Sequence, residues 1–197
     1  MPSSRRPLLL PRTLVDIAGA ARSQTDRGAG SARSPDAALR VQRASRNTAL
    51  LEAIVLNGLR ICEVIGLRQS DVDVKRMLIR RNCESPWMPL RTQDRGAWTS
   101  MVRQQKRNPP FFPPLSRVTI WRILRAAGED AGLRKPMNSR RARRVLGYML
   151  GRTHDLPART LAIALGVKDP RSIERYLQPP SLDDLPRSPS ARRRRQS

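Results

Sequence analysis

Aromatic residues are scarce in this sequence: they make up 4% of its 197 residues. This composition argues against a protein that stacks the bases of single-stranded nucleic acid on aromatic side chains. The single histidine, His154, cannot form a metal site alone, and Cys62 and Cys83 do not have the spacing of metal ligands. We therefore expect no metal, no cofactor and no small-molecule substrate, and we expect reduced thiols in a cytoplasmic protein.

The sequence also has no long hydrophobic run and few acidic residues. The run Leu8–Leu10 is too short, and too closely bounded by proline, to be a signal peptide or a membrane span. Against 16 Asp and Glu stand 39 Lys and Arg, which gives a net charge of +23 and a pI near 11.8. A charge of this size indicates a polyanionic partner, DNA or RNA first. Because no run is long enough to span a membrane, we expect no membrane partner.

The length and the composition along the chain predict one domain between two tails. Residues 1–45 are rich in Arg, Ser, Pro, Gly and Ala without a sustained apolar period, so we expect a disordered basic segment there. Residues 46–180 carry the apolar patterns of a folded domain. Residues 181–197 end in four consecutive arginines and a Gln-Ser pair, and they are expected to form a disordered basic tail.

Residues 47–67 carry the most informative pattern. Asn47 is a candidate N-cap, and Asn57-Gly58 is expected to break the helix that follows it. Arg60 then lies at the mouth of a tight turn between two helices, where the amide groups of the second helix would help it to hold an anion. The alternative is an arginine that extends from a helical hairpin into solvent. The expected apolar positions are Ala49, Leu50, Ala53, Ile54 and Leu56 in the first helix and Val64, Ile65 and Leu67 in the second.

A resemblance to a known family rests on this stretch. The residues Asn57-Gly58-Leu59-Arg60-Ile61-Cys62-Glu63, followed by Leu67 and by Asp71-Val72-Asp73, resemble the first arginine box of the tyrosine recombinases, the phage integrase family. The resemblance implies a mainly α fold with a small antiparallel three-stranded β-sheet, of the tyrosine-recombinase catalytic-domain type. It implies double-stranded DNA as the partner and a homo-oligomer on DNA, a tetramer in the family. The helical DNA-clamping domain that usually precedes the catalytic domain has no room in residues 1–45.

Three short apolar runs predict the three strands: Val72–Val74, Met77–Ile79 and Trp87–Leu90. The resemblance implies a catalytic lysine in a turn of this sheet. Counting back from Met88-Pro89-Leu90 puts that position on Arg81, with Arg80 as the near alternative. A solvated turn residue is the competing interpretation of Arg81.

The next segments predict a connecting loop and a helix. Phe111 and Phe112 are expected to anchor the Pro-rich loop 108–114 to the core. Ser116 is expected to cap a helix that Gly132 ends. Its predicted apolar face contains Val118, Trp121, Leu124, Ala127 and Ala131.

Residues 139–150 predict an amphipathic helix with a basic face. On a helical wheel Arg140, Arg143 and Arg144 gather opposite an apolar side formed by Ala142, Val145, Leu146, Met149 and Leu150. Guanidinium groups on one face suit a phosphate clamp, although a merely solvated basic face is the alternative. The segment resembles the second arginine box of the family, which implies that Arg143 is the second catalytic arginine and that Arg140 adds a contact. Arg141 with Arg144 is a shifted alternative, and we expect Arg141, Arg144, Arg80 and Lys168 to bind DNA.

The last landmark is a tyrosine. Leu156-Pro157 is expected to start a helix that buries Leu161, Ile163 and Leu165 and ends at Gly166. Tyr176 follows Gly166 by ten residues, which is where the resemblance implies the nucleophile. Tyr176 would attack a DNA phosphorus atom and form a 3′-phosphotyrosyl link, with Arg60 and Arg143 on either side of the phosphate. Val167 stands where the family has His or Trp, and Arg81 is a poor general acid, so we expect reduced turnover.

A second hypothesis belongs to another class of protein. Thr160–Leu177 also resembles a helix-turn-helix, which would make the chain a non-catalytic DNA-binding protein like a transcription regulator. Tyr176 would then be a core residue that points away from Arg60 and Arg143. A third hypothesis is a truncated or decayed integrase that binds DNA without cutting it. The positions of these three side chains discriminate between the first two hypotheses.

Overall fold

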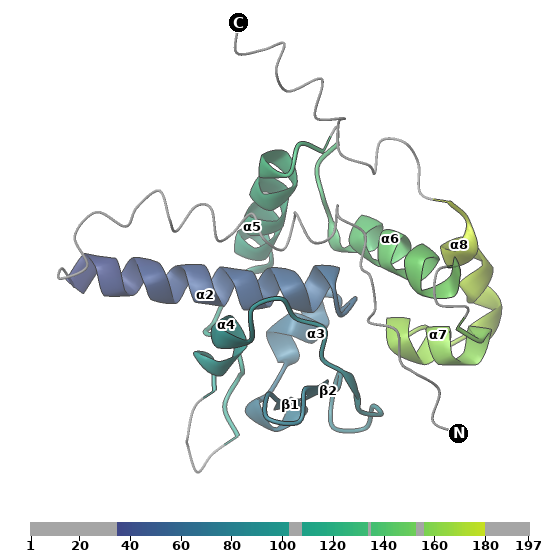
Figure 1. Ribbon diagram of the computed structural model, residues 1–197, viewed down its shortest axis with the longest axis horizontal. Coiled ribbons are helices and arrows are strands. Elements are labelled where there is room, and N and C mark those ends of the chain that lie inside the picture. The colour runs from purple at the N-terminus through teal and green to yellow at the C-terminus, as the bar shows by residue number, and fades with distance from the viewer. Residues whose placement is uncertain (1–34, 103–107, 134, 153–155, 180–197) are drawn as a thin grey trace, which may run out of the picture.

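The computed structural model describes residues 35–102, 108–133, 135–152 and 156–179 (Figure 1). Most of these residues are helical, and a small antiparallel sheet of three strands lies beside the helices. This arrangement confirms the predicted fold class. The expected basic tail 181–197 and residues 1–34 of the expected N-terminal segment lie outside the described residues.

In the described residues the elements follow one another as a long helix, a short helix, a 3₁₀ turn, the sheet and then six further helices or helical turns. Two 3₁₀ turns, η1 (Gln69–Asp71) and η2 (Pro170–Ile173), lead into β1 and α8. The strands are β1 (Val72–Asp73), β2 (Leu78–Ile79) and β3 (Met88–Pro89). The α-helices are α2 (Pro35–Val55), α3 (Ile61–Gly66), α4 (Arg95–Thr99), α5 (Arg117–Asp130), α6 (Ser139–Arg152), α7 (Ala158–Leu165) and α8 (Glu174–Leu177).

α2 begins well before the expected start. It starts at Pro35, so residues 35–45 are helical and the prediction of disorder is wrong for them. Proline suits a first helical turn because the amide at that position has no partner within the helix. Asn47 lies inside α2, where its side chain accepts hydrogen bonds from Arg46. Residues 36–43 show no buried stripe. This first half of α2 continues a helix that is stabilised by the packing of its second half.

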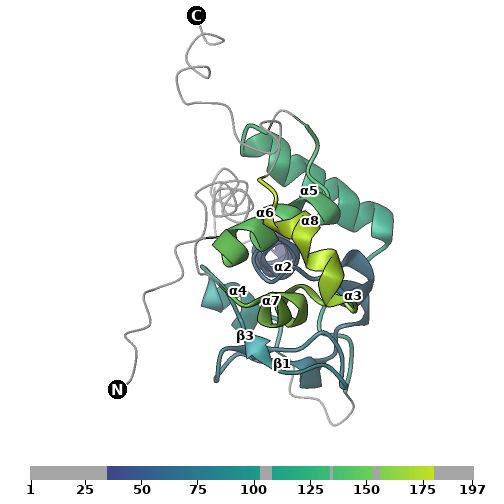
Figure 2. The ribbon, with the colours of Figure 1, turned by 90° about the vertical axis from the view of Figure 1, so that its right-hand side faces the viewer.

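The second half of α2 forms the centre of the core. α3, α4, α5 and α6 all contact this helix, and Figure 2 looks along it. Because neighbours enclose it, its side chains are buried all round and not along a single stripe. The buried residues are Ala49, Leu50, Leu51, Ala53, Ile54 and Val55.

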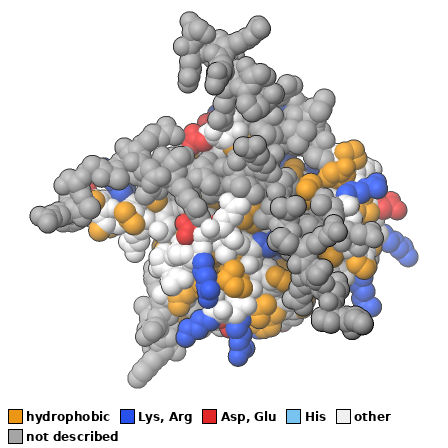
Figure 3. Space-filling model, viewed as in Figure 1, with side chains coloured by type: hydrophobic (Ala, Val, Ile, Leu, Met, Phe, Trp, Pro, Cys, Tyr) orange, Lys and Arg blue, Asp and Glu red, His pale blue; other side chains and the backbone are white. Residues whose placement is uncertain are grey.

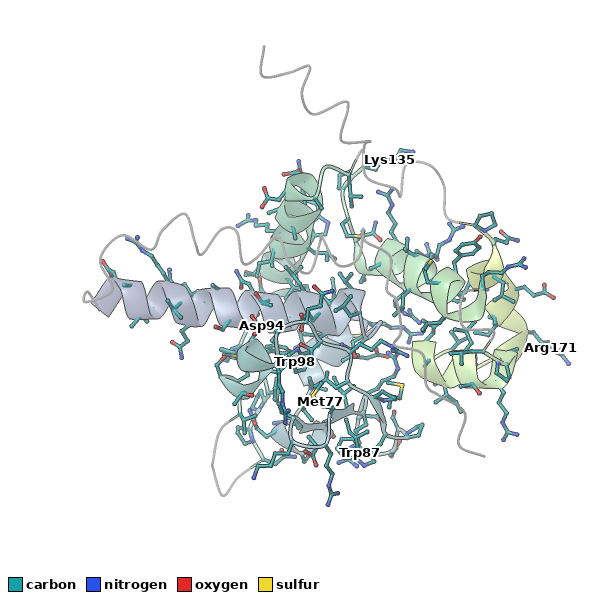
Figure 4. All side chains as sticks on the ribbon, viewed as in Figure 1. Met77, Trp87, Asp94, Trp98, Lys135 and Arg171 are labelled. Atoms are coloured by element: carbon teal, nitrogen blue, oxygen red, sulfur yellow. The ribbon has the colours of Figure 1, made fainter. Side chains whose placement is uncertain are left out.

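Two buried polar side chains hold the segment that leaves α2. The carboxylate of Glu52 accepts hydrogen bonds from Trp98 Nε1 (2.7 Å) and Thr92 Oγ1 (2.5 Å), which ties α4 to α2. Trp98 lies directly beside α2 in Figure 4. The side chain of Asn57 donates to the carbonyl of Arg91 and accepts from its amide, both at 2.8 Å. The turn from which Arg60 extends is therefore held by buried hydrogen bonds.

The turn between α2 and α3 confirms the predicted break at Asn57-Gly58. Gly58 supplies the positive φ, +64°, and a Cβ at this position would approach Leu146 Cδ2 to 3.0 Å. In α3, Val64 is buried as predicted but Ile65 is 41% exposed. A helix of six residues turns only a narrow face toward the core, and Val64 is the residue of α3 that lies on this face.

The sheet pairs β1 with β2 and β2 with β3, both antiparallel. Val72 lies opposite Ile79, and Ile79 lies opposite Met88; all three side chains are buried on the same face. Next to the sheet, Phe111 and Phe112 pack against each other with their ring centroids 5.2 Å apart, which confirms their predicted anchoring role.

α5 confirms a predicted helix, and Leu124, Ala127 and Ala131 are buried as predicted, but the first half of the predicted face is wrong. Ser116 caps it by accepting from the amide of Thr119, and Gly132 follows its end with φ +76°. Val118 and Trp121 are exposed, contrary to the prediction, and the Arg125 guanidinium lies over the Trp121 ring at 5.5 Å. In that first half, Ile120 takes the buried position instead, and Gly128 is also buried.

α6, α7 and α8 form the part of the fold that carries the C-terminal landmarks. α8 packs across α6 at two glycines one turn apart, Gly147 and Gly151. Gly166 ends α7 in the left-handed conformation, as predicted. Ile163, expected to be buried, is exposed on α7, because the buried stripe of this short helix runs through Leu161, Ala162, Ala164 and Leu165.

Candidate active site

The C-terminal end of α7 is where remote arginines meet. The last carbonyl groups of a helix have no partner within the helix and carry partial negative charge, so they attract cations. Each of three consecutive carbonyls here accepts a hydrogen bond from a different arginine. The donors are Nη2 of Arg81, Arg143 and Arg60, and the acceptors are the carbonyls of Ala164 (2.6 Å), Leu165 (2.5 Å) and Gly166 (3.3 Å), respectively.

These arginines come from three separate segments of the chain. Arg60 precedes α3, Arg81 follows β2, and Arg143 lies in α6. They are close enough that the charges of Arg60 and Arg143 both help to lower the pKa of Arg81. The expected meeting of Arg60 with Arg143 is therefore present, and Arg81 joins them.

Arg81 is a buried residue and not a solvated turn residue. It is 8% exposed, and its Nη1 donates to the carbonyl of Gly58 (3.3 Å) and to the carboxylate of Glu63 (2.5 Å). Burial is the largest cause of its lowered pKa, which the charge of Glu63 opposes. Gly166 leaves room for this side chain, because a Cβ there would lie 2.6 Å from Arg81 Nε.

Glu63 places a carboxylate among the guanidinium groups. Its Oε2 accepts from the backbone amide of Arg60 at 2.7 Å as well as from Arg81. The amide expected to help bind an anion at the start of α3 is therefore already bound to Glu63. Sequence analysis assigned Glu63 no role, although an acidic residue three positions after an N-cap is a recognised capping signal.

Arg143 faces inward, contrary to the helical-wheel prediction that it shares a face with Arg140 and Arg144. It is 7% exposed, and burial lowers the pKa of its guanidinium while Tyr176 raises it. Its Nε has no hydrogen-bond partner within the described residues. The wheel separated polar from apolar residues correctly, but α7 and α8 cover part of the polar side.

Tyr176 lies on α8 within reach of this cluster. The centroid of its ring is 5.8 Å from Arg143 Cζ, and the residue is half-buried. A Cβ on Gly147 would lie 2.8 Å from Tyr176 Cβ, so the absence of a side chain at Gly147 lets the tyrosine approach α6. Tyr176 and Arg143 therefore lie against each other because α8 crosses α6 at a glycine.

Two pockets join Arg60, Arg81 and Tyr176 into one groove, and Arg143 lines neither pocket. The first, which we call the tyrosine pocket, has a volume of about 340 Å³ and contains Arg60 and Tyr176. The second, the Arg81 pocket, has a volume of about 390 Å³ and contains Arg60, Glu63 and Arg81. Arg60, Val167 and Lys168 line both pockets, so the groove runs past these three residues from one pocket to the other.

The other predicted site residues lie outside the groove. Arg140 and Arg144 are exposed on α6 and line neither pocket. Arg141 donates to the carbonyl of Pro136 at 2.8 Å. Arg80 forms an ion pair with Asp71 at 2.9 Å, which engages it away from Arg60 and Arg143. Of the four residues expected to bind DNA, only Lys168 lines the groove.

The position of Tyr176 bears on the helix-turn-helix hypothesis. In that hypothesis Tyr176 is a core residue that points away from both arginines. Instead it lines a pocket with Arg60 and contacts Arg143. The segment after Gly166 also forms one 3₁₀ turn and a four-residue helix, which is too short for a recognition helix.

The described residues offer no cluster of three or more His, Cys, Asp or Glu side chains that could hold a metal ion. Within the same residues, no helix has both the length and the apolar character that crossing a membrane requires.

The fold is a mainly helical domain with a small antiparallel sheet of three strands. A crystal structure of XerA recombinase is similar to this chain, with a TM-score of 0.65 and 19% sequence identity. The match covers 99% of this chain and 64% of that protein. This likeness shows the fold. No protein-family model and no curated protein matches the sequence.

Proposed function

We propose that this chain is a site-specific DNA recombinase or integrase that cuts and rejoins double-stranded DNA through a 3′-phosphotyrosyl intermediate. The observation that carries the proposal is the meeting of Arg60, Arg143 and Tyr176 at the end of α7, from three distant parts of the sequence. The fold shared with XerA recombinase supports it.

The charge of the chain supports DNA as the substrate. The net charge is +23, and Figure 3 shows lysine and arginine side chains along the lower and right-hand edges of the molecule, around the sheet and around α7 and α8. Neutralising backbone phosphates is the main source of affinity for DNA. The groove between Arg60 and Tyr176 lies in this basic region.

The chemistry needs a nucleophile, charge neutralisation and an acid. The phenol oxygen of Tyr176 attacks the phosphorus atom, a bond forms between them, and the bond from phosphorus to the 5′-oxygen breaks. Arg60 and Arg143 stabilise the negative charge that grows on the non-bridging oxygens. The phosphotyrosyl bond conserves the energy of the broken bond, so rejoining needs no nucleotide.

Arg81 has a positioning role in this proposal. Its hydrogen bonds to Gly58, Glu63 and Ala164 tie the turn after α2, the start of α3 and the end of α7 together. A guanidinium group releases a proton too reluctantly to serve as a general acid. We therefore do not assign Arg81 the role of the lysine that the resemblance puts at its position.

The test is a covalent trap. Purified protein is incubated with duplexes that carry a random central sequence and nicks placed so that a cleaved strand end diffuses away. A covalent protein–DNA adduct is expected to accumulate and to remain after denaturation, because the rejoining strand is lost.

Tyr176→Phe is the matched control, since it removes one oxygen from a half-buried ring and keeps the packing against Gly147. The variant is expected to bind DNA like the wild type and to form no adduct. An adduct that persists in Tyr176→Phe, or a wild type that forms none, would contradict the proposed reaction.

A second candidate function is DNA binding without cleavage. The observation that favours it is that Nη2 of both Arg143 and Arg60 is already bound to α7 carbonyls, and that Val167 offers no hydrogen-bond donor. In that case the trap yields no adduct, although salt-sensitive DNA binding is retained.

A further inference from the structure

The proposed reaction leaves one chemical role unfilled. When the 5′-oxygen leaves, it needs a proton, and a positioned acid accelerates such a step by about 10²- to 10⁴-fold. Arg81 is buried and is a guanidinium, and Val167 has no proton to give. The acid must therefore be another group that reaches the groove.

Lys168 is the candidate that the groove contains. It lines the tyrosine pocket together with Arg60 and Tyr176, and it also lines the Arg81 pocket. Of the other described lysines, Lys75 lies in the turn between β1 and β2. Lys135 lies before the first residue of α6 and is labelled in Figure 4. Neither lines a pocket of the groove.

The backbone on both sides of Lys168 is held in place. The amide of Val167 donates to the carbonyl of Ala162 at 2.9 Å, which closes the end of α7. On the other side, the Asp169 carboxylate accepts from the amide of Arg171 at 3.0 Å and caps η2. Lys168 therefore extends a flexible side chain from a fixed point, and the residue is exposed.

The remaining polar groups of the tyrosine pocket fit the role less well. Arg60 and Arg175 are guanidinium groups, Asp169 is engaged as a cap, and Ser172 carries a hydroxyl of very low acidity. An ammonium group releases its proton more readily than a guanidinium and carries a positive charge that attracts the phosphate.

We propose that Lys168 is the general acid of the strand-cleavage step. This inference rests on the proposed function. The phenol oxygen of Tyr176 attacks the phosphorus atom, and the phenol proton passes to water. The bond between phosphorus and the bridging 5′-oxygen breaks, and this leaving oxygen takes a proton from the Lys168 ammonium. A free 5′-hydroxyl and a neutral amine result. In the rejoining step the 5′-oxygen attacks the phosphorus atom of the phosphotyrosine and gives its proton to the Lys168 amine. The bond from phosphorus to the phenol oxygen breaks, and the leaving phenolate takes a proton from water.

The test compares two leaving groups. One nicked trap carries an ordinary phosphodiester at the cleavage position, which is first mapped with the random-sequence trap. The other carries sulfur in place of the bridging 5′-oxygen; a thiolate leaves without needing a proton, so a missing acid no longer matters. Adduct formation is timed on both substrates for the wild type and for Lys168→Ala, Lys168→Arg and Arg60→Ala.

We expect Lys168→Ala and Lys168→Arg to be about 10²- to 10⁴-fold slower than the wild type on the oxygen substrate. Both are expected to return to within about tenfold of the wild-type rate on the sulfur substrate. Lys168→Arg keeps the charge, so its rescue separates proton donation from phosphate attraction. Arg60→Ala is expected to stay slow on both substrates. Lys75→Ala is a control for the loss of one positive charge, because Lys75 lies outside the groove.

Two results would overturn the assignment of Lys168: equal defects on the two substrates, or no defect on the oxygen substrate. In both cases a wild-type adduct that depends on Tyr176 leaves the proposed function standing. If the wild type forms no such adduct even with sulfur as the leaving atom, the proposed function fails and the role of Lys168 fails with it.

Discussion

Buried guanidinium groups need acceptors, and here most of these acceptors are main-chain carbonyls. Arg81 and Arg143 are both largely buried and both bind the end of α7. Glu63 is the acidic partner of Arg81, and the ion pair is shielded, with side chains 6% and 18% exposed. Removing one member of such a pair leaves the other charge without its counterion, which costs more than the pair itself contributes.

At this scale we predict that Glu63→Gln destabilises the fold. The change removes the charge that faces Arg81 and weakens the acceptor for the Arg60 amide. A loss of about 1–3 kcal/mol in the free energy of unfolding is expected, measured by urea denaturation.

Glu129→Gln is the matched control for this prediction. Glu129 pairs with Arg125 at 2.7 Å, but both side chains are about half exposed, so the loss should stay within about 0.5 kcal/mol. Equal losses in the two variants would show that the Glu63 contacts do not stabilise the fold.

At the scale of the elements, the crossing of α8 over α6 decides where the tyrosine lies. Gly147 and Gly151 remove the side chains that would keep these helices apart. The same face of α6 carries Arg143 one turn before Gly147, so a close crossing brings Tyr176 to that arginine. The absence of side chains at the crossing thus sets the geometry between Tyr176 and Arg143.

Gly147→Ala tests this geometry. The new methyl group would lie 2.8 Å from Tyr176 Cβ and 2.9 Å from Leu165 Cδ1, so α8 must move. We expect covalent adduct formation to fall by about 10²-fold, because a displacement of about 1 Å has an effect of that size on catalysis. Affinity for DNA, measured by fluorescence anisotropy, is expected to stay near that of the wild type.

Gly66→Ala is the control, since a methyl group at the end of α3 meets nothing within 4 Å. It is expected to leave adduct formation unchanged. A Gly147→Ala protein that forms adducts at the wild-type rate would show that the crossing distance does not position Tyr176.

The sequence predicted where helices begin and end better than it predicted which face of each helix is buried. Gly58, Ser116 and Gly166 mark their turns and caps through local backbone chemistry, so they could be read before the structure was known. Ile65 and Ile163 are apolar and exposed, because burial depends on which neighbour covers a helix. That information lies in the tertiary packing.

The candidate site shows the same division. The arginine boxes and the spacing to Tyr176 predicted which residues meet, through resemblance to a family with this fold. The burial of Arg81 and Arg143 and the part played by Glu63 could not be predicted, because they depend on where α7 ends relative to the sheet and to α6.

At the scale of the whole molecule, the proposed function implies that charge governs the affinity for DNA. Four of the arginines, Arg192–Arg195, lie in the last seven residues of the sequence. Each arginine that neutralises a phosphate adds about 0.9 to the slope of log affinity against log salt on duplex DNA. The C-terminal arginines are therefore expected to supply part of the salt dependence without contributing to sequence preference.

Deleting residues 191–197 tests this contribution. The slope is expected to fall by about three to four, measured by anisotropy between 50 and 300 mM salt, and the thermal midpoint of unfolding is expected to stay the same. Replacing the four arginines by lysine should keep the slope. An unchanged slope after the deletion would show that these residues do not contact phosphate.

The three arginines at the end of α7 already have hydrogen-bond acceptors within the protein. Before any nucleic acid arrives, Arg60, Arg81 and Arg143 already have resting partners in the main chain, so their mutual repulsion is offset inside the fold. An arriving phosphate oxygen would then replace a carbonyl oxygen as the ligand of a guanidinium. If the proposed function holds, binding of a phosphate is therefore an exchange of hydrogen-bond acceptors at the end of α7.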